Sequence, residues 1–194
     1  MLNRMNKAMK WMVALIVLLV IAISVLTYDS YQQMKEEKRH YQTFINNFYF
    51  SVQDSQGRIQ YLIEETPENA SLNHVIRLLE NDLLKTHYIL KSSDLFLDDL
   101  YYSQFFRQTS DLLYGMNFNQ NKIPPLGEDG KLDQREINLL RTIENNLEEI
   151  KKRMYSPETK QENPDLTLDE LNAIIMKYAN QIPSDVYREA SKSK

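Results

Sequence analysis

The chain opens with a long uncharged apolar stretch. Residues 11–28 (WMVALIVLLVIAISVLTY) contain no charged side chain and only two hydroxyl side chains before the final tyrosine. As a helix, this stretch rises about 27 Å, close to the hydrocarbon thickness of a bilayer, which is about 30 Å. Trp11 and Tyr28 mark its two ends, where aromatic side chains favour the membrane–water interface. The pattern predicts a transmembrane helix over residues 11–28 that contacts the lipid bilayer directly.

Charges on either side of this span predict its orientation. Arg4, Lys7 and Lys10 precede it, and Asp29 follows it directly. The positive-inside rule therefore predicts a single-pass protein of the cell membrane, with residues 1–10 as a short cytoplasmic N-terminus and the chain from residue 29 extracytoplasmic.

A cleaved signal peptide is the alternative, because it shares the basic start and the apolar stretch. The nearest small-x-small site is residues 22–24, and cleavage there would leave the apolar pair Val25 and Leu26 at the start of the mature chain. The length of the span and this poor site favour an uncleaved signal-anchor helix.

After the span, apolar residues recur with helical spacing, and strand-type alternation is nearly absent. A first helix is predicted from Asp29 to Glu65, and it can continue the span without a break. Its apolar residues fall on one stripe, which indicates a helix that faces a core. The stripe consists of Met34, Tyr41, Phe44, Ile45, Phe48, Tyr49, Val52, Ile59, Leu62 and Ile63.

A second helical region covers residues 67–114, with Thr66 as the predicted N-cap and Pro67 in the first turn. Its first half has one apolar stripe, whereas the stretch from Leu84 to Leu113 is apolar on two faces. Residues 92–94 interrupt the pattern with capping side chains, so the sequence leaves open whether this region forms one helix or two.

Two further helices have well-marked starts. Residues 115–131 hold three of the four glycines and are predicted to form a loop. Asp133 then caps a helix with Glu136 three residues later, and Thr167 and Glu170 repeat this capping box after a polar linker over residues 157–164.

The last helix is predicted to end before Pro183, which leaves residues 184–194 as a flexible tail. The predicted fold class is all-α: one N-terminal transmembrane helix followed by an antiparallel bundle of four to five helices over residues 29–183.

The charge and the cysteine content of the chain limit the classes of partner and site that we expect. All 27 acidic residues follow the span and three of the 23 basic residues precede it, so the extracytoplasmic part carries a formal net charge of −7, from 20 basic and 27 acidic side chains. An acidic domain repels phosphate backbones, and no nucleic-acid partner is expected. The chain has no cysteine, which excludes disulfides, thiolate metal sites and cysteine nucleophiles.

Metal sites receive little support from the sequence. Residues 129–136 are similar to the second half of an EF-hand loop, with Asp129, Asp133 and Glu136 at ligand positions. The first half is missing, because Pro125 and Gly127 stand where two carboxylates are needed, and the capping box already explains two of the acids. His40, His74 and His87 are scattered along the chain, and no metal or cofactor is expected.

No nucleophile motif, phosphate-binding glycine loop or converging acid pair is present, so we predict no catalytic residues and a protein that is not an enzyme. An enzyme with a dispersed site remains a further alternative, because such a site leaves no sequence signature.

The chain has more aromatic residues than a single helical core needs. Phe50 and Tyr61 form a row on the back of the first helix, and Tyr88, Tyr102 and Phe106 lie on the second apolar face. Such rows can mark a protein-binding surface, although a central helix buried on both sides gives the same pattern. The sequence favours a non-enzymatic envelope protein that binds or scaffolds a partner protein through these five residues. An extracytoplasmic domain that senses a small ligand between helices is the alternative.

Overall fold

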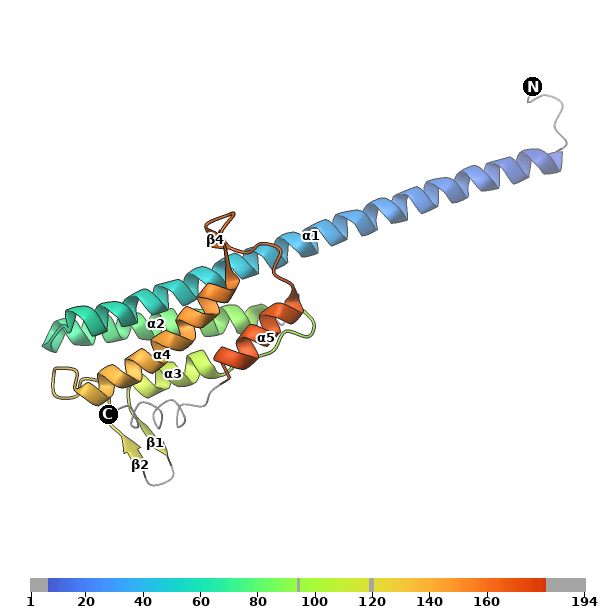
Figure 1. Ribbon diagram of the computed structural model, residues 1–194. Coiled ribbons are helices and arrows are strands. Elements are labelled where there is room, and N and C mark those ends of the chain that lie inside the picture. Colours follow the sequence, from blue (N-terminus) through green and yellow to red (C-terminus); the bar gives the residue numbers. More distant parts are fainter. Residues whose placement is uncertain (1–6, 94, 119–120, 181–194) are drawn as a thin grey trace. The chain divides into compact units, whose positions relative to one another are not determined.

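The computed structural model describes residues 7–93, 95–118 and 121–180 (Figure 1). The chain divides into two compact units, Met1–Tyr41 and Gln42–Lys194. The longest element, helix α1 (Lys7–Glu65), runs through the boundary without a break, as the sequence allowed. The predicted tail over residues 184–194 lies outside the described residues. The last helix was predicted to run up to Pro183, but it ends earlier, at Tyr178 with Ala179 as its C-cap.

Within the first unit, α1 exposes its apolar side chains all round. The large apolar residues from Trp11 to Leu26 are exposed, and α1 contains the one stretch of the described chain that is long and apolar enough to cross a membrane. Its two hydroxyl groups bond within the helix: Ser24 Oγ donates to the carbonyl oxygen of Val20 at 2.8 Å, and Thr27 Oγ1 donates to that of Ile23 at 2.7 Å. A segment with its polar groups satisfied internally is suited to lipid.

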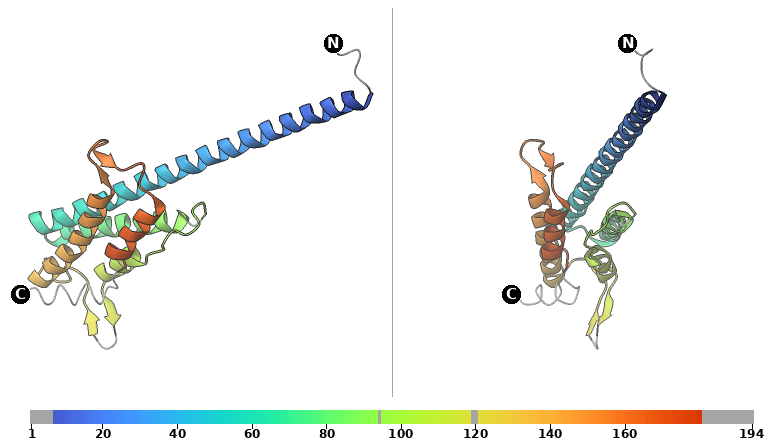
Figure 2. Two further views of the ribbon diagram at one scale, coloured as in Figure 1. Left: turned by 45° about the vertical axis from the view of Figure 1, so that its right-hand side comes forward. Right: turned by 90° about the vertical axis from the view of Figure 1, so that its right-hand side faces the viewer.

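The second unit is a helical bundle, which confirms the predicted fold class. It comprises the C-terminal part of α1 with α2 (Asn69–Ser93), α3 (Phe105–Leu113), α4 (Gln134–Met154) and α5 (Leu168–Tyr178). Helix α2 packs against α3, and α4 packs against α5 (Figure 2). The region left open by the sequence therefore forms two helices, α2 and α3.

The core is built around phenylalanine rings of α1 and α3. Phe48 meets Phe106 edge to face with ring centroids 5.9 Å apart, and Phe105 meets Phe106 at 5.4 Å. Aromatic pairs of this geometry add about 0.5–1.5 kcal/mol beyond the burial of their area. Leucine and isoleucine side chains of all five helices fill the remaining core, among them Ile59, Leu79, Leu112, Leu147 and Ile175. The predicted stripe of α1 is buried from Phe44 to Leu62, but Met34 belongs to the first unit and is 61 % exposed.

Both predicted capping boxes are confirmed. Asp133 accepts from the backbone N–H of Glu136 at 2.8 Å, and Glu136 accepts in return from the N–H of Asp133 at 2.7 Å. Thr167 and Glu170 exchange the same two bonds at the start of α5. These side chains satisfy N–H groups that the first turn of a helix leaves without partners.

The predicted start of the second helix was wrong by a few residues. Helix α2 begins at Asn69, and Thr66 has a φ of 41°. Thr66 directly follows α1, where a left-handed residue commonly ends a helix, so it terminates α1 instead of capping α2. The carbonyl of Glu68 accepts from Ser71 and Leu72 N–H and begins α2.

Two short hairpins lie in the segments that the sequence predicted as a loop and a linker. In the predicted loop, β1 (Met116–Phe118) pairs antiparallel with β2 (Asn121–Ile123), and in the predicted linker β3 (Tyr155–Ser156) pairs with β4 (Gln161–Glu162). Strands of two or three residues are too short to give an alternating pattern, because recognition of that pattern needs about four residues.

Candidate functional site

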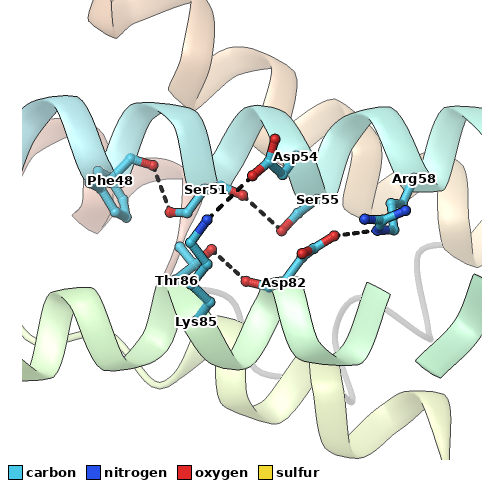
Figure 3. A network of polar contacts seen from close by, with 8 residues as sticks. All are labelled: Phe48, Ser51, Asp54, Ser55, Arg58, Asp82, Lys85 and Thr86. Atoms are coloured by element: carbon cyan, nitrogen blue, oxygen red, sulfur yellow. Dashed lines mark hydrogen bonds and ion pairs between the residues drawn. The ribbon is translucent and has the colours of Figure 1, made fainter. Parts of the chain in front are cut away.

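A seam of small polar residues joins α1 to α2 in an antiparallel pair (Figure 3). Ser51, Ser55 and Thr86 are fully buried. Their hydroxyl groups donate to backbone carbonyl oxygens of their own helices, at 2.8, 3.0 and 2.9 Å. Because these side chains are small and satisfy themselves locally, they fill the seam without needing a partner on the opposite helix.

Two ion pairs cross the rim of this seam. Arg58 of α1 pairs with Asp82 of α2, and Asp54 of α1 pairs with Lys85 of α2 at 3.4 Å (Figure 3). The residue order falls along α1 as it rises along α2, which fixes the antiparallel register. Both pairs are partly exposed, so each contributes at most about 1 kcal/mol to stability.

Beside the seam lies a groove of about 530 Å³. Its lining combines α1 side chains with one apolar side chain of α2: Gln53, Asp54, Gly57, Arg58, Tyr61 and Val75. Gly57 lines the groove without a side chain, and a Cβ atom added there would meet no atom within 4 Å, so this part of the groove, which we call its floor, is open. A glycine inside a helix costs about 1 kcal/mol relative to alanine, and no packing contact of the described fold requires this one.

The five aromatic residues predicted from the sequence do not form one surface. Phe50 and Tyr61 lie on the outer side of α1, where Phe50 is half-buried against the ring of Tyr49 and Tyr61 is 45 % exposed in the groove wall. Tyr88 is 58 % exposed and Tyr102 is half-buried. Phe106 is fully buried, so its assignment to a binding surface was wrong: its ring packs on Phe48 in the core.

Tyr88 and Tyr102 flank a buried histidine. The ring of His87 lies 5.4 Å from that of Tyr88 and 5.7 Å from that of Tyr102, and Tyr102 Oη is 3.3 Å from His87 Nε2. His87 is only 1 % exposed, and no described group forms a hydrogen bond with its Nδ1. These tyrosines therefore cover a structural histidine and belong to a different surface from the groove.

The last acid of the EF-hand-like segment, Glu136, is used by the fold. Glu136 Oε1 accepts from the N–H of Gly127 at 2.7 Å, while Oε2 accepts from that of Asp133. Both oxygens that a cation would need are thus occupied by backbone donors. Across the described residues, no group of three or more histidine, aspartate or glutamate side chains is placed to hold a metal ion.

One carboxylate of the bundle has a shifted pKa. Burial raises the pKa of Glu144 on α4, and the negative charges of Glu148 and Glu64 raise it further. A carboxyl group facing like charges is a cost of packing α1 against α4, and no described nucleophile or base shares a hydrogen bond with it.

Sequence reasoning missed the α2 side of the groove. Arg58 and Val75 meet only because α1 and α2 pair with a particular register, and spacing along one helix carries no such information. The available signal was Gly57 itself, an isolated glycine inside a helical pattern. No family of known proteins, no curated protein and no solved structure matches this chain.

Proposed function

We propose that this chain is a membrane-anchored, non-enzymatic protein of the cell envelope that binds a partner protein through the Gly57 groove on α1. The observation that carries the proposal is the open floor at Gly57. Retaining a helix-destabilising residue where the fold needs none is understandable if another side chain enters the groove. A tyrosine wall, a small floor and charged rim residues form a composition typical of protein-binding hot spots.

Membrane anchoring is supported by the length and exposure of the apolar part of α1. In the proposed topology residues 11–28 span the bilayer, the basic N-terminus is cytoplasmic, and the bundle lies on the opposite side. Partners are then membrane or extracytoplasmic proteins with a protruding apolar or aromatic side chain.

The groove can be tested by filling it. Gly57→Trp places a large side chain on the floor, whereas the matched control Gly57→Ala adds one methyl group in open space. Gly57→Ala should raise the free energy of unfolding by about 1 kcal/mol, because alanine has the higher helix propensity. Both variants should fold, as judged by circular dichroism and thermal unfolding.

Site-specific photocrosslinking then reports the partner. A photoreactive amino acid at Gln53 should give a discrete adduct in native membranes, and Gly57→Trp should abolish that adduct while Gly57→Ala preserves it. The same probe at exposed Asn145 on α4 is the background control. A Gln53 adduct that persists in Gly57→Trp, or that the probe at Asn145 gives equally, would refute the groove as the binding surface.

A further inference from the structure

A second pocket, of about 660 Å³, lies between the start of α2 and the loop that precedes α4. Its wall on α2 carries Asn69, Asn73 and Arg77, spaced four residues apart along one face. The wall on the loop carries Glu128 and Asp129. The pocket therefore presents a guanidinium group and two carboxylates from separate elements.

The loop is held against α2 by two glycines. Gly127 and Gly130 have φ angles of 66° and 86°, and an added Cβ atom would approach Leu72 to 2.5 Å and Asn69 to 2.6 Å. The carbonyl oxygen of Gly130 accepts from Asn69 N–H at 2.6 Å. Glycine favours this backbone conformation and leaves room for the Leu72 and Asn69 side chains, so it suits the contact between the loop and α2.

The charged groups of the pocket form no ion pairs within the described fold, and Asp129 accepts one backbone hydrogen bond, from Lys131 N–H to its Oδ1 at 3.3 Å, which leaves its second oxygen for a ligand. No carboxylate of the described chain lies within ion-pair distance of Arg77, and Glu128 and Asp129 form no ion pair with a described lysine or arginine. All three side chains are exposed. The floor, by contrast, is apolar, because buried Ile76, Leu113 and Leu126 contribute to the lining.

Another residue that lines the pocket, Tyr114, forms a hydrogen bond within the fold. The hydroxyl group of Tyr114 donates to Glu80 Oε2 at 2.8 Å. That bond ties the Tyr114 side chain, which lines the pocket, to Glu80 of α2. Burial, followed by this hydrogen bond and the charge of Glu80, raises the pKa of Tyr114, while the charge of Arg77 acts in the opposite direction.

We infer that this pocket binds a small zwitterionic ligand that carries a carboxylate and an ammonium group, as free amino acids and short peptides do. Arg77 pairs with the carboxylate, because guanidinium and carboxylate match as two parallel hydrogen bonds. Glu128 and Asp129 pair with the ammonium group, and Asn73 supplies an amide that can bond a peptide unit. The excess of one carboxylate favours ligands with an additional positive charge. This site is separate from the Gly57 groove and does not depend on it.

Thermal unfolding of the full chain in nanodiscs tests the inference. The probes are L-alanine, L-lysine, Ala-Ala-Ala and Lys-Ala-Ala, each compared with its N-acetylated and C-amidated forms. A ligand at about tenfold its Kd should raise Tm by about 3–6 °C for a domain of this size. Binding by the single amino acids identifies free amino acids as the source, and binding by the tripeptides alone identifies peptides.

Variants separate the two walls. Arg77→Gln should reduce the Tm shift with the unmodified probes to the level of the C-amidated probes. Glu128→Gln combined with Asp129→Asn should reduce it to the level of the N-acetylated probes. Exposed Arg141→Gln and Glu148→Gln on α4 are the matched controls and should retain the shift. Because all these side chains are exposed, each variant should fold, and its Tm shift is measured against its own Tm without ligand.

Two results overturn the inference: no Tm shift with any of the four unmodified probes, or a shift that Arg77→Gln and the loop double variant leave intact. Crosslinking at the Gly57 groove is unaffected by either result, so failure of this site and failure of the proposed partner surface are distinguishable.

Discussion

At the scale of single residues, His87 combines burial with an incomplete set of hydrogen bonds. Burial lowers its pKa, and the positive charges of Arg107 and Lys91 lower it further, while Asp111 acts in the opposite direction. The other polar neighbour is the hydroxyl group of Tyr102. The native state therefore binds a proton on this ring less readily than the unfolded chain does.

This difference predicts a loss of stability in mild acid. The unfolded pKa of histidine is about 6.5 and the folded value is lower, so the neutral ring's contribution is complete above about pH 6.5 and is lost as the pH falls through the folded pKa. Denaturant unfolding between about pH 7.5 and pH 5.5 should show the decline. In His87→Gln the decline should be smaller, while His74→Gln, at an exposed position of the same helix, should keep the wild-type slope. Equal slopes in all three proteins would contradict this account.

At the scale of elements, the two capping boxes are the best-specified local structures of the chain. Replacing Asp133 or Thr167 with alanine removes the acceptor for one N–H group in the first turn of α4 or α5. Each substitution should lower the free energy of unfolding by about 0.5–2 kcal/mol, measured by chemical denaturation of the full chain. Asn145→Ala, at an exposed position inside α4, is the control and should not lower stability, because alanine is the better helix former. If Asp133→Ala behaved like this control, the cap would be contributing nothing.

The elements also show what the sequence could predict. Helix starts that depend on a local exchange of hydrogen bonds, as at Asp133 and Thr167, were predicted correctly because all the atoms involved lie within four residues. Phe106 was misplaced for the opposite reason. A helical stripe tells which residues share a face, but not whether that face meets solvent or another helix, and α3 proved to be buried against Phe48 of α1. Pairing between helices also produced the α2 wall of the groove, and the contact between the loop and α2 produced the loop wall of the second pocket.

At the scale of the whole molecule, the absence of cysteine makes topology directly testable. Single-cysteine variants Asn3→Cys and Asn145→Cys can be treated with a membrane-impermeant maleimide in intact cells. The proposed topology predicts labelling at residue 145 and labelling at residue 3 only after the membrane is opened. The reverse pattern would place the bundle in the cytoplasm. An intact mass that begins downstream of residue 24 would identify a cleaved signal peptide in place of an anchor.

The carboxylate of Glu136 accepts hydrogen bonds from two segments, from Gly127 N–H in the loop and from Asp133 N–H at the start of α4. Each of its oxygens serves one of these segments, so a displacement of either segment strains the bond that holds the other. We therefore expect a ligand bound beside Gly127, in the pocket we propose, to reduce the fraying of α4. Linkage is reciprocal, so a change that stabilises the helix start should strengthen ligand binding by the same free energy.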